Sequence, residues 1–207
     1  MCLPSALNLQ ILSMLPIRKN LRLKEYDYSS EGYYFVTICV HQGKSLFGSI
    51  LNSEMILNDA GHMIHKWYNE LENKFPDIKC HEMITMPNHF HCIIEKHISV
   101  GCSTQHTGRH IGLPLQGDLD IVDVEELVRK EEINTCLATV AQWFKTMTTN
   151  SYIKGVKENS WEKFNGRFWH RNYYEHIIRN YRSYENIANY IITNPARWVK
   201  DVYNLEK

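Results

Sequence analysis

Two histidines separated by a single residue form the first group in this sequence that could do chemistry. His89 and His91 flank Phe90 in an apolar segment rich in strand-forming residues. Side chains of an extended strand alternate between its two faces, so both imidazoles should point to one face and Phe90 into the core. Neutral imidazole binds divalent transition metals well. The spacing therefore predicts a two-nitrogen metal clamp, although two histidines can also simply line one face of a sheet.

A tyrosine and an asparagine lie four residues apart near the C-terminus. At helical spacing Tyr190 and Asn194 share one face of a helix, one turn apart. Two imidazoles and an amide oxygen leave positions open for water or phosphate oxygens, and an oxygen-rich remainder suits Mg²⁺ or Mn²⁺. Structural zinc is disfavoured because it prefers four closed ligands and because Cys92 should face the other side of the strand. These groups together fit a metal-assisted nuclease whose nucleophile is a tyrosine.

More than one tyrosine could be the nucleophile in this hypothesis. A phenol needs activation, since its ordinary pKa of about 10 keeps it protonated near neutrality. A cation on the scissile phosphate and nearby arginines would both assist the attack. The chain has 12 tyrosines, and Tyr190 is distinguished only by its spacing to Asn194. Tyr173, Tyr174 and Tyr184 remain alternative nucleophiles.

The elements that must position these groups follow from changes in the sequence period. Residues 32–40 are β-branched and aromatic and predict a buried strand, and residues 47–57 predict short edge strands around a turn at Asn52-Ser53. The remaining expected elements are a helix from a cap at Asn58 or Asp59 to residue 74, paired strands at 80–86 and 89–95, a helix at 139–153, a strand at 168–178 and a helix from Ser183 to Thr193. This order predicts an α+β fold with a ferredoxin-like antiparallel sheet, helices packed on one face, and a C-terminal helix that carries Tyr190.

Length and composition fit one domain with additions. We expect an N-terminal arm at residues 1–24 and a domain at 25–207, interrupted by a Gly-, Ser-, Thr- and then Asp/Glu-rich flexible insertion at about 97–134. No segment resembles a signal peptide or a transmembrane helix, so we expect a cytoplasmic protein without a membrane partner. The six cysteines are scattered, and we expect them to be reduced.

Charge is balanced over the whole chain but not along it. With 23 basic and 23 acidic residues, no global field attracts a polyanion. Basic residues do gather in the N-terminal arm and in the last fifth of the chain. The candidates for contact with DNA are Arg18, Lys19, Arg22, Lys24, Arg167, Arg171 and Arg179.

The segment from Met86 to Ile94 resembles the histidine-hydrophobe-histidine motif of the single-tyrosine HUH transposases. From Arg18 onward the chain resembles the branch called REP-associated tyrosine transposases, in residues 21–29, 33–39, 46–48, 169–180 and 190–195, in that order. The resemblance implies a DNA-transposing endonuclease, associated with the nucleoid of a prokaryote, that acts on single-stranded DNA beside a hairpin. It implies His89 and His91 as metal ligands, Asn194 as the third ligand, and Tyr190 as the nucleophile that forms a 5′-phosphotyrosine.

Other interpretations remain open at this stage. The acidic insertion and the neutral overall charge depart from the pattern of the resembling branch, which weakens the expectation of strong DNA binding. The alternatives are a non-cleaving hairpin-binding protein of the same fold and a rolling-circle-type replication initiator. A homodimer is compatible with the sequence, and Tyr190 could then complete the site of its own subunit or that of its partner.

Overall fold

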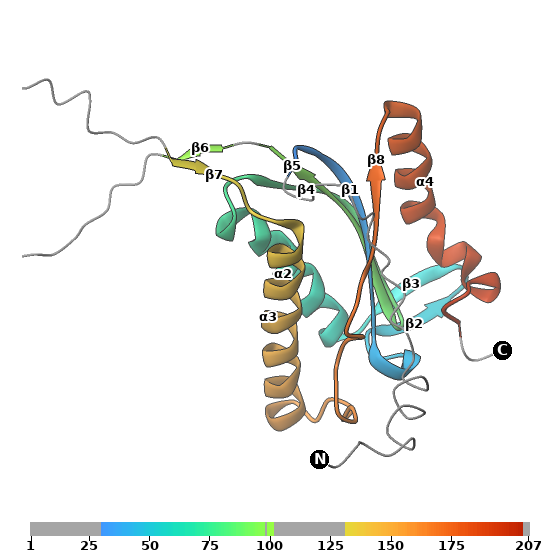
Figure 1. Cartoon of the computed structure of the whole chain (residues 1–207). Coiled ribbons are helices and arrows are strands. Elements are labelled where there is room, and N and C mark those ends of the chain that lie inside the picture. Colours follow the sequence, from blue (N-terminus) through green and yellow to red (C-terminus); the bar gives the residue numbers. More distant parts are fainter. Residues whose placement is uncertain (1–29, 98, 102–130, 205–207) are drawn as a thin grey trace, which may run out of the picture.

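A four-stranded antiparallel sheet forms the centre of the computed structural model, which describes residues 30–97, 99–101 and 131–204. Its strands are β1 (Gly32–Cys39), β4 (Ile78–Met86), β5 (His89–Lys96) and β8 (Tyr174–Ile178), in the spatial order β4-β5-β1-β8. Helices α2 (Asp59–Lys74) and α3 (Leu137–Glu158) cover one face, and α4 (Tyr181–Arg197) lies on the other (Figure 1). This is the ferredoxin-like α+β arrangement expected from the sequence, with the tyrosine helix added to it.

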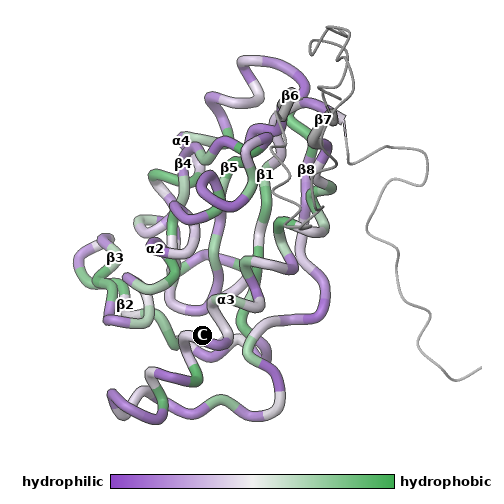
Figure 2. The backbone as a smooth tube through the Cα atoms, turned by 90° about the vertical axis from the view of Figure 1, so that its left-hand side faces the viewer, coloured by the Kyte–Doolittle hydropathy of each residue, from purple (hydrophilic) through white to green (hydrophobic). Residues whose placement is uncertain are grey.

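Alternation along the two central strands divides the apolar residues between two cores. Val36 and Phe90 belong to the larger cluster, which also contains side chains of α2 and α3. Ile93 points to the opposite face and packs with Ala188 and Ile191 of α4 in a much smaller cluster. In Figure 2 the tube through β1 is largely hydrophobic, whereas the outer loops are mostly hydrophilic. The sheet is therefore covered on both faces.

The hairpin and the helix cap predicted in the first half of the chain are both present. Strands β2 (Gly48–Leu51) and β3 (Glu54–Leu57) form a hairpin whose turn residues Asn52 and Ser53 both have positive φ, as a tight hairpin turn requires. Asn58 caps α2 by accepting a hydrogen bond from the Gly61 backbone at 2.9 Å. Both the hairpin and the cap were expected.

The prediction of a strand over residues 168–178 is largely wrong. Only Tyr174–Ile178 forms β8, and Trp169 contributes an isolated bridge to Val40. Phe168 and Trp169 are adjacent, and both pack into the larger core. A regular strand does not allow this, because neighbouring side chains face opposite sides.

The predicted bounds of the last helix also need correction. Asn180 caps α4 by accepting a hydrogen bond from the Ser183 backbone, so the helix begins before Ser183. Pro195 does not stop the helix, because it lies in the last turn, where it removes a single backbone hydrogen bond. The helix therefore continues past Asn194 to Arg197, and a short 3₁₀ turn, Trp198–Lys200, follows.

The ends of the predicted insertion pair with each other. Strands β6 (Ser99–Gly101) and β7 (Glu131–Ile133) form a two-stranded antiparallel sheet, whereas no strand was expected in this segment. The rest of the insertion and the predicted N-terminal arm, with Arg18, Lys19, Arg22 and Lys24, lie outside the described residues. Among the helices that the structure describes, none is both long enough and apolar enough to cross a membrane.

Candidate functional site

The two histidines lie side by side on the face of β5 that α4 covers. The exposed fractions of His89 and His91 are 0% and 1%, and their ring centroids are 4.5 Å apart. Phe90 and Cys92 point to the opposite face, into the larger core. The predicted orientation of all four side chains is thus confirmed.

Hydrogen bonds on the Nδ1 side orient both imidazoles. His89 Nδ1 lies 2.8 Å from Asn88 Oδ1, and His91 Nδ1 lies 2.7 Å from Thr37 Oγ1. The Asn88 amide nitrogen donates to the Gly43 and Tyr203 carbonyl oxygens, so its oxygen must face His89. His89 therefore carries its proton on Nδ1 and presents the lone pair of Nε2, the arrangement that metal-binding histidines usually have. Sequence reasoning missed Asn88 and Thr37 as orienting residues.

Burial keeps both imidazoles neutral. Loss of solvation, together with the nearby His91, lowers the pKa of His89 from its usual value to about 2. Loss of solvation also lowers the pKa of His91 to about 3. Neutral rings are the form in which histidine binds metals.

Tyr190 reaches the histidine pair from α4 of the same chain. Its hydroxyl lies 3.5 Å from His91 Nε2, and the two ring centroids are 5.4 Å apart. Burial and the carboxylate of Asp201 raise the pKa of the phenol above its usual value, whereas Asn194 and Arg197 act in the opposite direction. The structure therefore brings together the imidazoles and the phenol that the sequence singled out, although 99 residues separate Tyr190 from His91.

Asn194 is the most unusual side chain of the site. It is fully buried, and neither polar atom of its carboxamide makes a hydrogen bond within the described part of the chain. It does lie close enough to the Tyr190 hydroxyl to lower the pKa of that phenol. A buried amide without partners costs about 1–3 kcal/mol, so native proteins rarely keep one without a use.

The donor set fits a divalent cation. In the described part of the chain His89 Nε2 is also buried without a hydrogen-bond partner, so its lone pair can bind a metal ion. In the described residues no third His, Cys, Asp or Glu joins the pair. The buried Asn194 carboxamide, next to Tyr190, is the candidate for an oxygen ligand. Two nitrogens and one amide oxygen suit an open site better than a closed structural one.

Replacing Asn194 with leucine tests whether this side chain is kept for a ligand. Leucine has nearly the same shape and needs no hydrogen bond, so we expect the free energy of unfolding in EDTA to rise by about 1 kcal/mol. Mn²⁺ should stabilise the unchanged protein by mass action and should stabilise Asn194→Leu less. Urea unfolding with and without Mn²⁺ measures both effects. Asn186→Leu, at an exposed position of the same helix, is the control, and an equal Mn²⁺ response in Asn194→Leu and the unchanged protein would exclude Asn194 as a ligand.

Residues after α4 complete the wall of the site. The Tyr203 ring lies 4.6 Å from the His89 ring, centroid to centroid, and the Trp198 ring lies 6.0 Å from it. Burial raises the pKa of Tyr203, and the neighbouring Cys39 and Tyr190 act in the same direction. Sequence reasoning missed Tyr203 and Trp198, because they follow the last periodic segment and no motif marks them.

Most of the other predicted residues lie away from the histidine pair. Tyr184 donates a hydrogen bond to Glu82, and the Lys145 ammonium group lies over the Tyr173 ring. Tyr174 is closer: it is 58% exposed on β8 and pairs with Thr37 of β1, which pairs on its other side with His91. Arg167 and Arg171 line a groove beside α3. Arg179 follows the end of β8 that pairs with Tyr33, whereas the histidines pair with the other end of β1.

A polar cluster at that far end fastens α4 to the sheet. The Tyr184 hydroxyl donates to Glu82 at 2.6 Å and lies 3.3 Å from His81 Nδ1. His81 Nε2 in turn lies 2.8 Å from a Glu95 oxygen. Together with the small apolar cluster, these contacts set the position of α4 along the sheet, and so place Tyr190 level with the histidines.

The fold and the site define the class of this protein: a ferredoxin-like α+β domain with a buried histidine pair faced by a helix-borne tyrosine. No family model matches the chain. It is 37% identical to an uncharacterised protein of Haemophilus influenzae over 186 aligned residues. The alignment covers 89% of this chain and 91% of that protein. The chain belongs to the same family as that protein.

Two solved structures are similar at lower levels of identity. A REP-associated tyrosine transposase bound to a REP hairpin is 19% identical, with a TM-score of 0.49, over 87% of this chain and 78% of that one. A candidate transposase from Deinococcus radiodurans R1 is 11% identical, with a TM-score of 0.40, over 84% of this chain and 96% of that one. Both likenesses are weak, and the site described above stands without them.

Proposed function

We propose that this protein is a metal-dependent endonuclease and strand transferase, a transposase, that cuts single-stranded DNA through a covalent bond to Tyr190. The observation that carries the proposal is the 3.5 Å separation between the Tyr190 hydroxyl and His91 Nε2, within one chain. A phenol at this distance from a buried, neutral imidazole pair is in position to attack a phosphate held by the same pair.

The residues divide the chemistry between them. His89, His91 and Asn194 would hold Mg²⁺ or Mn²⁺, which when bound would polarise the scissile phosphate. The Tyr190 oxygen forms a bond to phosphorus as it loses its proton, the bond from phosphorus to the 3′ oxygen breaks, and that oxygen takes up a proton. The products are a 5′-phosphotyrosine and a free 3′-hydroxyl. Because the new ester conserves the phosphodiester linkage, a second 3′-hydroxyl can reverse the step and join another strand.

The surroundings of Tyr190 support this role. Burial and Asp201 raise the pKa of the phenol, and Arg197, in the last turn of α4, offsets part of this rise and would favour the phenolate that must attack. Burial of the histidine pair limits competition from water at the phosphate. The resemblance of residues 169–180 and 190–195 to REP-associated tyrosine transposases extends the proposal to unpaired DNA next to a hairpin.

A covalent adduct is the direct test. The full-length protein is incubated with Mg²⁺ or Mn²⁺ and labelled single-stranded oligonucleotides that contain hairpins from the DNA flanking its gene. We expect a labelled protein band that survives denaturation and a shortened oligonucleotide with a free 3′-hydroxyl, both absent in EDTA. Tight binding of these oligonucleotides without any adduct would instead favour the non-cleaving hairpin-binding protein.

A further inference from the structure

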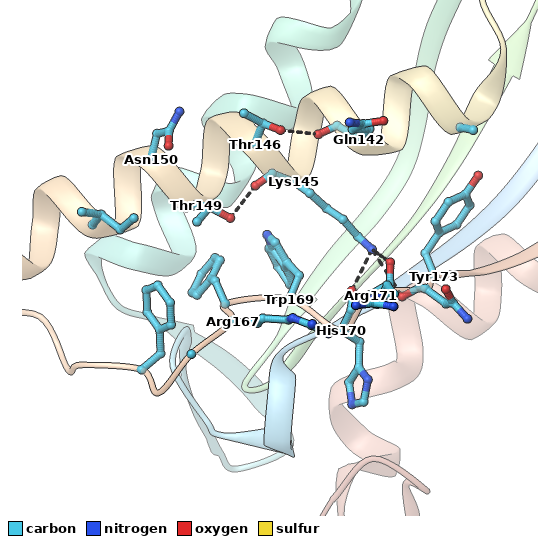
Figure 3. Close-up of a pocket in the computed structure, with 16 residues that line it drawn as sticks. Gln142, Lys145, Thr146, Thr149, Asn150, Arg167, Trp169, His170, Arg171 and Tyr173 are labelled. Carbon is cyan, nitrogen blue, oxygen red and sulfur yellow. Dashed lines mark hydrogen bonds between the residues drawn. The ribbon is translucent and has the colours of Figure 1, made fainter. Parts of the chain in front are cut away.

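A large groove with both polar and apolar side chains lies beside α3, which covers the face of the sheet opposite to the histidine pair. It has a volume of about 980 Å³ and runs between α3 and the loop of residues 164–173, which leads into the edge strand β8 (Figure 3). Gln142, Thr146 and Asn150 contribute one exposed stripe along α3, at intervals of four residues. Arg167 and Arg171 face them from the loop side.

The groove is positively charged. Its lining contains Lys145, Arg167 and Arg171, and no aspartate or glutamate of the described residues belongs to it. Lys145 reaches across from α3 and donates to the backbone oxygens of His170, Arg171 and Asn172 at 3.0–3.3 Å (Figure 3). Carbonyl groups, rather than a carboxylate, therefore accept hydrogen bonds from this half-buried ammonium group, so they leave its positive charge in the groove without neutralising it.

The pKa shifts leave Lys145 charged and His170 neutral near pH 7. Burial lowers the pKa of Lys145 to about 8, so the ammonium group keeps its charge near neutrality. Burial, His41 and Lys145 all lower the pKa of His170, which leaves this ring neutral and able to accept or donate a hydrogen bond. A neutral imidazole, amides, hydroxyls and guanidinium groups together suit a backbone of phosphates and sugars.

A second, smaller cavity lies between this groove and the residues that surround the histidine pair. It has a volume of about 520 Å³, and its lining shares His170, Asn172 and Tyr173 with that of the groove. Its lining also includes Thr37 and Asn88, the two residues that orient the imidazoles. The loop before β8 therefore lines both cavities, and the path considered below follows this loop from the α3 side toward the site.

Aromatic side chains stand along this path. Tyr174 and Tyr203 line the smaller cavity, and Tyr174 is 58% exposed. Exposed aromatic rings stack on unpaired bases whatever their sequence, and a cavity of this volume can take one base. The path thus offers base stacking near the histidine pair and phosphate contacts farther away.

We propose that the groove between α3 and the loop of residues 164–173 binds the sugar-phosphate backbone of the DNA strand that continues from the cleaved bond. The strand would leave the histidine pair through the smaller cavity, pass the edge at β8 and lie along the polar stripe of α3. Arg167 and Arg171 would contact its phosphates. The identity of the ligand rests on the proposed function, whereas the groove itself and its charge do not.

Equilibrium binding separates this proposal from cleavage. Labelled hairpin oligonucleotides are titrated in EDTA with Tyr190→Phe, and with Tyr190→Phe that also carries Arg167→Gln and Arg171→Gln. We expect the two arginine substitutions to weaken binding about tenfold at low salt, and to reduce the slope of log K against log salt concentration by about 1.4, that is about 0.7 for each lost phosphate contact. The matched control replaces two exposed lysines elsewhere, Lys74→Gln and Lys157→Gln, and should leave the slope unchanged.

Neutral linkages in the DNA locate the contact. Methylphosphonates replace a few phosphates on the 5′ or the 3′ side of the cleaved bond. On the side that occupies the groove, the arginine substitutions should lose their effect, because the charge they contact is already gone. Equal binding and equal salt slopes with and without the two arginines would overturn the groove proposal. If the unchanged protein still forms the adduct in that case, the proposed function stands. A groove effect without any adduct supports DNA binding here while it contradicts the proposed cleavage.

Discussion

Tyr190→Phe is expected to abolish the covalent adduct with DNA and to reduce strand cleavage by about a thousandfold or more. Phenylalanine keeps the ring that contacts His91 and Phe35 but lacks the oxygen that would bond to phosphorus. The fold should therefore persist, and binding of the oligonucleotide should change little. Denaturing gels that show labelled protein, together with a binding titration, measure the two effects separately.

Two further tyrosine variants make this result specific. Tyr203→Phe tests the second phenol that packs on the histidine pair, and Tyr174→Phe tests an exposed tyrosine of the edge strand β8. We expect both variants to form the adduct. If Tyr203→Phe lost the adduct and Tyr190→Phe kept it, the nucleophile would be Tyr203 and not Tyr190. Mass spectrometry of the peptide that carries DNA would then identify the nucleophile.

His91→Ala should have an effect of similar size through a different route. It removes one of the two imidazoles that would hold the cation, so cleavage in Mn²⁺ should fall by more than about a hundredfold. Direct titration with Mn²⁺ should show a weaker or absent site. The buried ring also stacks against Phe35 at 5.3 Å, so circular dichroism and urea unfolding are needed to show that the variant is folded.

An exposed histidine provides the matched control for this change. His62 lies on the solvent side of α2, on the other face of the sheet. His62→Ala should bind Mn²⁺ and cleave DNA as the unchanged protein does. If folded His91→Ala retained the Mn²⁺ affinity of the unchanged protein, the histidine pair would not be the metal site.

Sequence periodicity predicted the half of the site that regular structure determines. The alternation of a strand placed His89 and His91 on one face, and helical spacing placed Tyr190 and Asn194 on another. The ferredoxin-like order of strands then limited how these two faces could meet. What the sequence could not show was the contact itself, because β5 and α4 lie far apart along the chain.

The parts that sequence reasoning missed depend on tertiary contacts. Residues 168–178 have the composition of a strand, but Phe168 and Trp169 are both buried in the larger core. In addition, Lys145 donates hydrogen bonds to the carbonyl oxygens of residues 170–172, which a strand would use to pair with its neighbour. Pro195 indicates the end of a helix, yet its place in the last turn allows the helix to continue. Tyr203 reaches His89 only because Asn88 binds the Tyr203 backbone oxygen.

The unequal size of the two cores has a consequence for how the site fails. The histidines belong to the central sheet, which the larger core stabilises. Tyr190 stands on a helix that packs through a much smaller apolar cluster, with four buried and six partly buried members, and through one polar cluster. Detaching that helix should therefore cost a fraction of the free energy of global unfolding. Heat or denaturant would then separate Tyr190 from the histidine pair while the rest of the domain is still native.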